Sequence, residues 1–184
     1  MHKASRLKRK LSIALQTVPL ALFSAGCFSS DPLAGEVSAF SPTSARCITP
    51  EDVERSADQV LQLVNLERAA LDLPPVVKNE ILEKIADDYA CRMIEESFFG
   101  HTDPTNGHGP GDRAVVARYH FYAIGENLAA GLDTPADVMK EWMGSPSHRA
   151  IILDPQWTQI GIGVRRGGEY LTYWVQEFGT PADF

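Results

Sequence analysis

The chain has 184 residues, 44% of them hydrophobic, and its 24 acidic side chains outnumber 17 lysines and arginines to give a net charge of −7. A chain of this length and apolar content can bury one core, and it shows no internal repeat. The acidic balance argues against nucleic acid and anionic lipid as partners, because both carry negative charge.

The first 27 residues have the composition of a secretory signal. Residues 3–10 carry five basic side chains and no acid, and a mainly apolar run follows at residues 11–23. This run is shorter than the roughly 20 apolar residues of a membrane-spanning helix, so we do not interpret it as a permanent anchor. Removal of the leader takes away five of the 17 bases and leaves 12 against 24 acids, a net charge of −12.

The leader ends in a motif for lipid attachment. Ala25-Gly26-Cys27 resembles a bacterial lipobox, in which Cys27 becomes the lipidated first residue, although Ser24 stands where such boxes usually carry Leu. Residues 28–46 are rich in Ser, Pro, Gly and Ala and predict a flexible tether. We therefore expect an exported lipoprotein anchored to the membrane of the cell envelope. The alternative is cleavage near Ala25, which leaves a free thiol at Cys27 and a secreted protein.

Export gives the other two cysteines a structural meaning. In an oxidising compartment Cys47 and Cys91 can pair, and each lies beside or inside a predicted helix of the same small domain. The sequence favours this disulfide over the alternative of two buried free thiols.

The first half of the domain predicts helices. Thr49-Pro50-Glu51-Asp52 is typical of a helix start, with a capping hydroxyl, an early proline and acids in the first turn, and Pro74-Pro75 marks the stop. A second helix is predicted from a continuous apolar face and ends near Phe98-Phe99-Gly100, which places His101 just past its C-terminus. That face consists of Ile81, Leu82, Ile85, Ala86, Tyr89, Ala90, Met93 and Ile94.

The second half predicts two further helices and a hairpin. Residues 112–118 indicate a short helix, and Thr134-Pro135 begins another that Pro146 interrupts. Ile160, Ile162 and Val164 alternate with glycines as in a strand, and residues 165–168 form a turn into a second strand at residues 170–178. The expected class is α+β, with helices covering a small antiparallel sheet.

Several short motifs in this order resemble the CAP superfamily of cysteine-rich secretory, antigen 5 and pathogenesis-related 1 proteins, in its compact bacterial branch. The resemblance runs from about Val60 to the C-terminus. It implies the α-β-α sandwich of CAP (SCP-like) domains, here over residues 47–184. It rests on Asn65-Leu66-Glu67-Arg68, Phe99-Gly100-His101-Thr102, Gly125-Glu126-Asn127-Leu128, Ser145-Pro146-Ser147-His148-Arg149, Ile160-Gly161-Ile162-Gly163-Val164 and Tyr173-Trp174-Val175-Gln176-Glu177-Phe178-Gly179.

The resemblance also implies a cleft. In larger CAP proteins two histidines and two glutamates line it, and His101, Glu126 and His148 match three of these four positions. The fourth, three residues after a tryptophan, is Ser145 here, which leaves the cleft with one carboxylate fewer. A serine nucleophile at Ser145 or Ser147 is weakly indicated, because Ser-Pro-Ser also ends a helix.

Two imidazoles and a carboxylate suit zinc or another divalent metal. We therefore expect His101, His148 and Glu126 to form a metal site, with the alternative that Glu126 only hydrogen-bonds and joins the segments around the cleft. The chain lacks the His-Glu-x-x-His spacing that would indicate a zinc hydrolase.

These observations predict a monomeric, exported CAP-domain protein whose cleft binds a small ligand, a lipid, a divalent metal or an envelope component, without established catalysis. The alternative function is a metal-assisted hydrolase acting on envelope peptides or esters. A third class is a structural envelope protein, for which changes in the cleft would be harmless.

Overall fold

The computed structural model describes residues 46–182, so the predicted signal, Cys27 and nearly all of the tether lie outside the described part. The described residues form five helices and four strands. The helices are α1 (Val53–Ala69), α2 (Glu80–Glu95), α3 (Pro110–Val116), α4 (Pro135–Gly144) and α5 (Pro146–Ile152), and the strands are β1 (Val77–Lys78), β2 (Phe121–Ala130), β3 (Gln159–Gly167) and β4 (Leu171–Pro181).

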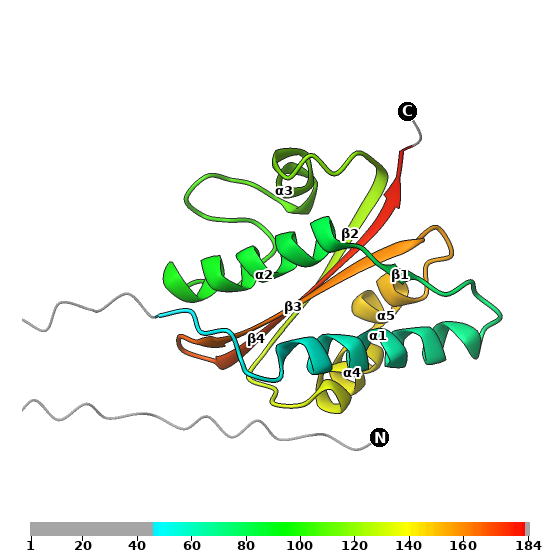
Figure 1. The fold of residues 1–184 in the computed structure, drawn as a ribbon, viewed down its shortest axis with the longest axis horizontal. Coiled ribbons are helices and arrows are strands. Elements are labelled where there is room, and N and C mark those ends of the chain that lie inside the picture. The colour runs from blue at the N-terminus through cyan, green and yellow to red at the C-terminus, as the bar shows by residue number, and fades with distance from the viewer. Residues whose placement is uncertain (1–45, 183–184) are drawn as a thin grey trace, which may run out of the picture. The chain divides into compact units, whose positions relative to one another are not determined.

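The strands form one sheet in the order β1-β3-β4-β2. Helices α2 and α3 cover one face, and α1, α4 and α5 cover the other (Figure 1). The predicted α+β sandwich is confirmed, and β3 and β4 form the predicted hairpin. The sheet is mixed where we expected it to be antiparallel, because Val77 and Lys78 pair in parallel with β3 just after the two prolines.

The helix boundaries differ from the predictions wherever a proline is involved. Helix α1 begins at Val53 and not near Pro50, because Val53 N–H donates to Pro50 O in a tight turn that precedes it. Helix α3 begins two residues early, with Pro110 in its first turn. Pro146, expected only to interrupt a helix, begins α5, since the first helical position needs no N–H donor.

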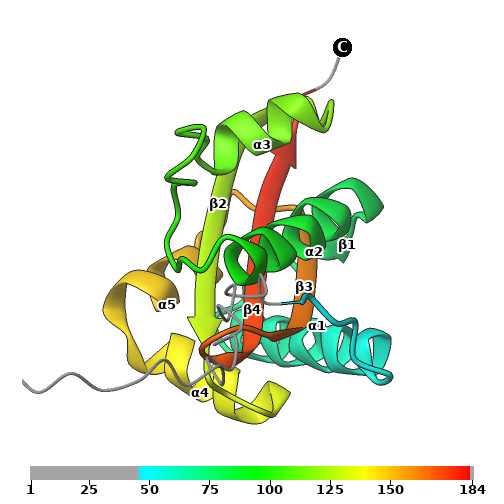
Figure 2. The same ribbon diagram turned by 90° about the vertical axis from the view of Figure 1, so that its left-hand side faces the viewer.

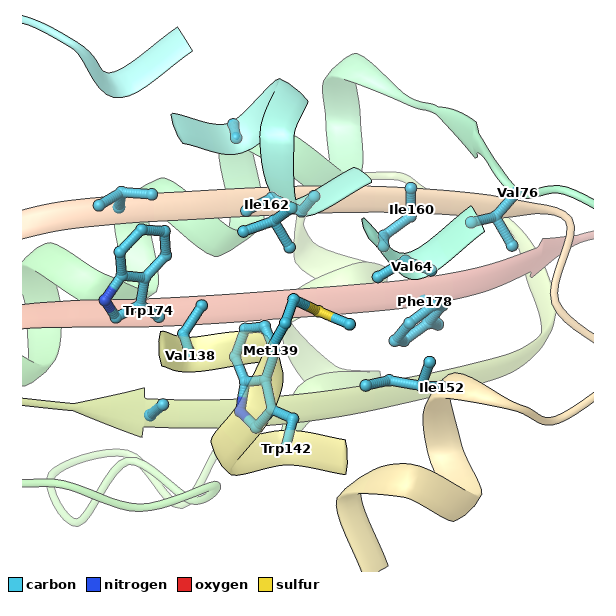
Figure 3. Close-up of a cluster of buried hydrophobic side chains, with 14 of the residues drawn as sticks. Val64, Val76, Val138, Met139, Trp142, Ile152, Ile160, Ile162, Trp174 and Phe178 are labelled. Carbon is cyan, nitrogen blue, oxygen red and sulfur yellow. The ribbon is translucent and has the colours of Figure 1, made fainter. Parts of the chain in front are cut away.

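The largest core cluster fills the space between the sheet and the layer of α1, α4 and α5. Alternate residues of the hairpin, among them Ile162, Trp174 and Phe178, point into this layer against Val64 and Trp142 (Figure 3). The indole of Trp142 donates to Leu128 O at 3.1 Å, so its one polar atom is satisfied inside the core.

Helix α2 lies directly on β3, backbone against backbone. A Cβ atom added to Gly161 would overlap the main chain at Leu82 and Glu83, and one added to Gly163 would overlap the main chain at Ala86. The alternating glycines that predicted a strand therefore also set how closely the helix approaches it.

The Asn65-Leu66-Glu67-Arg68 motif stabilises this fold. The Asn65 side chain exchanges two hydrogen bonds with the main chain of Val76, at 3.0 and 2.9 Å. Arg68 is completely buried and donates to four main-chain carbonyls, which fix the end of α1 to the segment between α5 and β3. Those carbonyls belong to Pro74, Ile152, Asp154 and Trp157.

The predicted disulfide is present. Cys47 and Cys91 are bonded, with their Cα atoms 5.2 Å apart and 44 positions apart in the sequence. The bridge joins the start of the described chain to α2, and next to it Ile48 pairs with Arg166 of the hairpin. No helix between residues 46 and 182 has both the length and the apolar character needed to cross a bilayer.

Candidate functional site

Two glutamates lie side by side in the middle of the sheet. Glu126 of β2 is the register partner of Glu177 of β4, so both side chains point to the face covered by α2 and α3. Their side chains are 1% and 0% exposed. Two carboxylates this close and this buried cannot both be charged without a nearby cation.

Arg113 of α3 provides the cation. Its Nη2 forms an ion pair with Glu126 Oε2 and lies 3.6 Å from Glu177 Oε1. Its Nη1 donates to the carbonyls of His101 and His108, at 3.1 and 3.2 Å, and thereby holds the loop before α3. One guanidinium thus balances the buried charge and orders the segment that carries His101.

The ring of Tyr89 in α2 packs against this arginine. The Arg113 guanidinium carbon lies 3.4 Å from the centre of the Tyr89 ring, a cation–π contact. Burial, the largest effect, raises the pKa of Tyr89 to about 12, so its hydroxyl stays protonated. That hydroxyl donates to Gly100 O at 2.5 Å.

Burial raises the pKa of Glu177 well above its ordinary value, and the negative charge of Glu126 raises it further, while Arg113 opposes both. Neither oxygen of Glu177 has a hydrogen-bond partner among the described residues. Glu177 is therefore the member of the pair whose protonated form the fold favours.

His101 is the exposed end of this cluster. Its Nδ1–H donates to Glu126 Oε1 at 2.7 Å, and 54% of its side chain is exposed. This hydrogen bond is the largest effect on the pKa of His101 and raises it. The bond fixes the ring through Nδ1, which makes Nε2 the nitrogen that can accept a proton or bind a metal.

His148 approaches from the opposite face of β2. It lies in α5, where its main-chain carbonyl accepts from Asn127 Nδ2 at 3.2 Å. Its Nδ1 is buried without a hydrogen-bond partner in the described part of the chain. Burial, followed by the charge of His101, lowers the pKa of His148, so the neutral imidazole is favoured.

Ser145 stands at the junction of α4 and α5. Its hydroxyl lies 3.1 Å from that of Ser147, and both are at the surface. This position agrees with the helix-boundary role of Ser-Pro-Ser. Within residues 46–182, Ser145 forms no side-chain hydrogen bond with His101 or Glu126.

The geometry fits two metal ligands better than three. Both Glu126 oxygens are engaged, one by His101 and the other by Arg113, and the guanidinium would repel a cation placed there. Within residues 46–182, no three His, Cys, Asp or Glu side chains gather in a way that could hold an ion. The imidazoles of His101 and His148 are the groups suited to a metal, with Glu126 orienting His101 through its other ring nitrogen.

A groove of about 670 Å³ lies between α2 and α3, beside the glutamate cluster. Ile81, Ile85, Tyr89 and Val116 give it apolar walls, and Arg113 belongs both to the groove and to the cluster. None of the four predicted cleft residues lines it. The rest of the lining is Ala117 and a set of charged and polar side chains, namely Glu80, Lys84, Asp88, Arg92, Asp103, Asn106 and His108.

Two central members of the cluster were missed from the sequence. Arg113 orders the loop before α3, and its pairing with Glu126 was not predicted. Glu177 lies in the last of the family-like motifs, and the sequence predicted no role for it. One sequence signal could have found Glu177, namely an ionisable residue within a buried strand. Burying such a side chain costs free energy unless it has a partner, so its position indicates a buried partner.

Comparison with known proteins shows the family to which the chain belongs. Residues 61–178 match the sequence profile of the CAP family, described as the cysteine-rich secretory protein family. The chain belongs to the CAP family.

This CAP domain has bacterial relatives. It is 35% identical over 136 residues to the uncharacterized protein YkwD of Bacillus subtilis (strain 168), a match that covers 74% of this chain and 51% of YkwD. It is 30% identical over 124 residues to the uncharacterized membrane protein YlbC of the same organism, covering 67% of this chain and 34% of YlbC. The match therefore spans about half of the first relative and about a third of the second.

Solved structures share the fold. An extracellular protein containing an SCP domain from Bacillus anthracis has a TM-score of 0.63 at 28% identity, covering 72% of this chain and 44% of that one. An outer surface protein from Borrelia burgdorferi has a TM-score of 0.66 at 23% identity, covering 75% of this chain and 99% of that one. The second likeness, at this identity, shows the fold alone.

Changing Glu177→Gln should make the CAP domain more stable at neutral and alkaline pH. Between the ordinary pKa of 4.5 and the raised value, the folded state keeps a proton that the unfolded chain has lost, so stability falls as pH rises. The loss is at most about 1.4 kcal/mol per pH unit, and the neutral amide removes it. Urea unfolding of both proteins across this range measures the difference.

Glu126→Gln is the matched control and should behave in the opposite way. It removes the partner of Arg113 and His101 and should destabilise the fold across the pH range. The pKa of His101 is also raised in the fold by its bond to Glu126. The stability that this bond contributes is therefore present below the ordinary pKa of 6.5 and is lost as the pH rises through the raised pKa. The free energy of unfolding of Glu177→Gln should therefore still fall with pH, because of His101, but less steeply than that of the unchanged protein. A fall parallel to that of the unchanged protein would show that Glu177 is ionised in the fold.

Proposed function

We propose that this CAP-domain protein is exported, anchored by lipid to the cell envelope, and binds a small amphipathic envelope ligand in the groove between α2 and α3. The groove itself is the observation that carries the proposal. Export is supported by the leader and by relatives described as extracellular and as an outer surface protein. The fold alone would support many activities, so the ligand class is argued from the groove.

The groove has the features of a binding site for a small molecule. Its volume of about 670 Å³ lies in the usual range for such pockets. Ile81 and Val116 remain 40% and 69% exposed, although they are large apolar side chains on two neighbouring helices. Covering them with the apolar part of a ligand would be favourable, and ion pairs at the edge, such as Lys84 with Asp88, would remain in contact with water.

Arg113 gives the groove a connection to the rest of the site. It lines the groove while pairing with Glu126, which in turn holds His101. A polar group at this end of the ligand would therefore lie near the cluster. This arrangement supports a ligand with an apolar body and one polar end.

Val116→Glu should weaken ligand binding about tenfold, since it places a charge where the apolar body of the ligand would lie. Val115→Glu is the control, because Val115 is 67% exposed on the same helix but does not line the groove. Titration with the fluorescent amphiphile anilinonaphthalene sulfonate measures both affinities. Equal affinities for the two variants would remove the groove as the binding site.

Cys27→Ser should release the protein from the membrane fraction. The proposed anchor depends on a thioether at Cys27, which serine cannot form, and residues 46–182 supply no spanning helix. Fractionation of cells, followed by detection of the protein in membrane and soluble fractions, tests this. If the serine variant partitions as the unchanged protein does, lipid attachment at Cys27 is wrong.

Zinc binding is the second candidate, and the observation that favours it is the bond between His101 Nδ1 and Glu126. A metal held by His101 and His148 would have open positions for water, the chemistry that a metal-assisted hydrolase of envelope peptides or esters would need. Glu126 would orient one imidazole and Arg113 would hold the loop that carries it.

His101→Ala or His148→Ala should abolish zinc binding measured by calorimetry at neutral pH. His120 is not one of the predicted site residues, so His120→Ala should leave zinc binding intact. Affinity should fall in mild acid, because an imidazole must be neutral to bind a metal. Glu126→Gln should reduce the affinity without abolishing it if the carboxylate only orients His101. Absence of zinc binding in the unchanged protein would leave the groove as the proposed site.

A further inference from the structure

The tip of the β3–β4 hairpin carries an exposed apolar surface that the proposed groove does not use. Leu171 is 71% exposed, Tyr170 42%, Phe99 44% and Ile48 52%. The three aromatic rings here pack edge to face, with Phe99 and Tyr170 both contacting the buried Tyr173. We call the four exposed side chains the tip surface.

Leu171 is unusual in its backbone as well as in its exposure. Its φ of 66° lies in the left-handed region that glycine and asparagine adopt far more readily than leucine. A leucine here costs backbone energy and buries little of its own side chain. Neither folding nor solubility accounts for this residue, which suggests that something covers it.

The described chain enters the domain at this same end. Ile48 pairs with Arg166 of β3, and the carbonyl of Arg46 lies against Gly167 at the turn. Figure 1 shows the first described segment, in cyan, beside the hairpin tip and the end of α2. In Figure 2 the tip lies at the end of β4 opposite to the C-terminus.

The chain length between the proposed anchor and this entry point limits the distance. The tether predicted from the sequence, residues 28–46, has 19 residues, and a flexible chain of that length would have an end-to-end distance of roughly 25 Å. A domain of the described size is roughly 35 Å across. The anchor would therefore keep the tip end, more than the far end, near the membrane.

Charge near the tip permits this approach. Exposed charges around it are Arg46 and Arg166 against Glu95, Glu169 and Asp133, which accepts a hydrogen bond from Thr172, while Glu96 pairs with Arg92. The chain after Cys27 has twice as many acids as bases. The tip is thus less acidic than the chain average. Tyrosine is also a side chain enriched at the membrane–water interface, where its ring is apolar and its hydroxyl is wet.

We infer that the tip surface docks on the lipid bilayer, so that Tyr170 and Leu171 enter the interface and orient the anchored domain. The occupant is lipid, and neither a protein partner nor a second copy of the chain is required. This inference rests on the proposed anchor at Cys27 and gives that anchor a geometric role.

The test uses the lipidated full protein in phosphatidylcholine vesicles, with lipids brominated on their acyl chains as the quencher. Tyr170→Trp places a fluorophore at the tip, and Tyr122→Trp is the control, because Tyr122 is 71% exposed at the far end of the sheet. The native Trp142, Trp157 and Trp174 are buried and give a constant background. Brominated lipid should lower the added emission about twofold for Tyr170→Trp and leave that of Tyr122→Trp unchanged.

A second substitution tests the contribution of Leu171. Leu171→Asn suits the left-handed backbone, so the domain should fold at least as well, and thermal unfolding checks this. Added to Tyr170→Trp, it should reverse most of the quenching, because the tip loses its most exposed apolar side chain.

The outcomes separate the docking from the anchor. If the protein remains with the vesicles but Tyr170→Trp is quenched no more than Tyr122→Trp, the docking is wrong and the anchor stands. If the protein does not remain with the vesicles, both are wrong. If Leu171→Asn folds and leaves the quenching unchanged, the tip surface is not what contacts the lipid.

Discussion

Contact between the backbones of α2 and β3 is the constraint on which the rest of the molecule depends. Because Gly161 and Gly163 have no side chains, the helix lies on the strand without a spacer. This fixes the height of α2 above the sheet and so the level at which Tyr89 supports Arg113. The same contact sets one wall of the groove. Larger residues at the two glycines would raise the helix and separate the arginine from its carboxylates.

The cluster around Arg113 shows how one cation can organise a site from several segments. Glu126 and Glu177 come from neighbouring strands, Arg113 from α3, and His101 from the loop that the arginine holds. In a buried site of low dielectric such contacts are strong when complete and costly when one partner is missing. Because successive side chains of β2 point to opposite faces, Glu126 contacts His101 on one face and Asn127 contacts the main-chain carbonyl of His148 on the other. The two histidines thus come from segments on opposite faces of the sheet, and the charge of His101 still lowers the pKa of His148.

Local patterns predicted much of the fold. The apolar face of α2, the cap of α4 at Thr134 and the hairpin are properties of short windows, and the disulfide followed from export and an even pair of cysteines. Strand β2 was not predicted, because Gly125, Glu126 and Asn127 have low strand propensity and the pairing with β4 overrides it. The pairing of Glu126 with Glu177 depends on that register, which no local spacing reveals. The contact of His101 with Glu126 could be anticipated only through the family resemblance.

The disulfide has a mechanical consequence for a domain held at its N-terminal side. A pulling force applied through the segment before Cys47 passes across the sulfur atoms into α2 at Cys91. Residues 48–90, including all of α1 and most of α2, lie inside the covalent loop and bear no tension. The load instead reaches the end of α2, next to the strands that hold the buried cluster. Reduction of the bridge would move the load onto Ile48 and α1, so the mechanical resistance of the domain depends on its redox state.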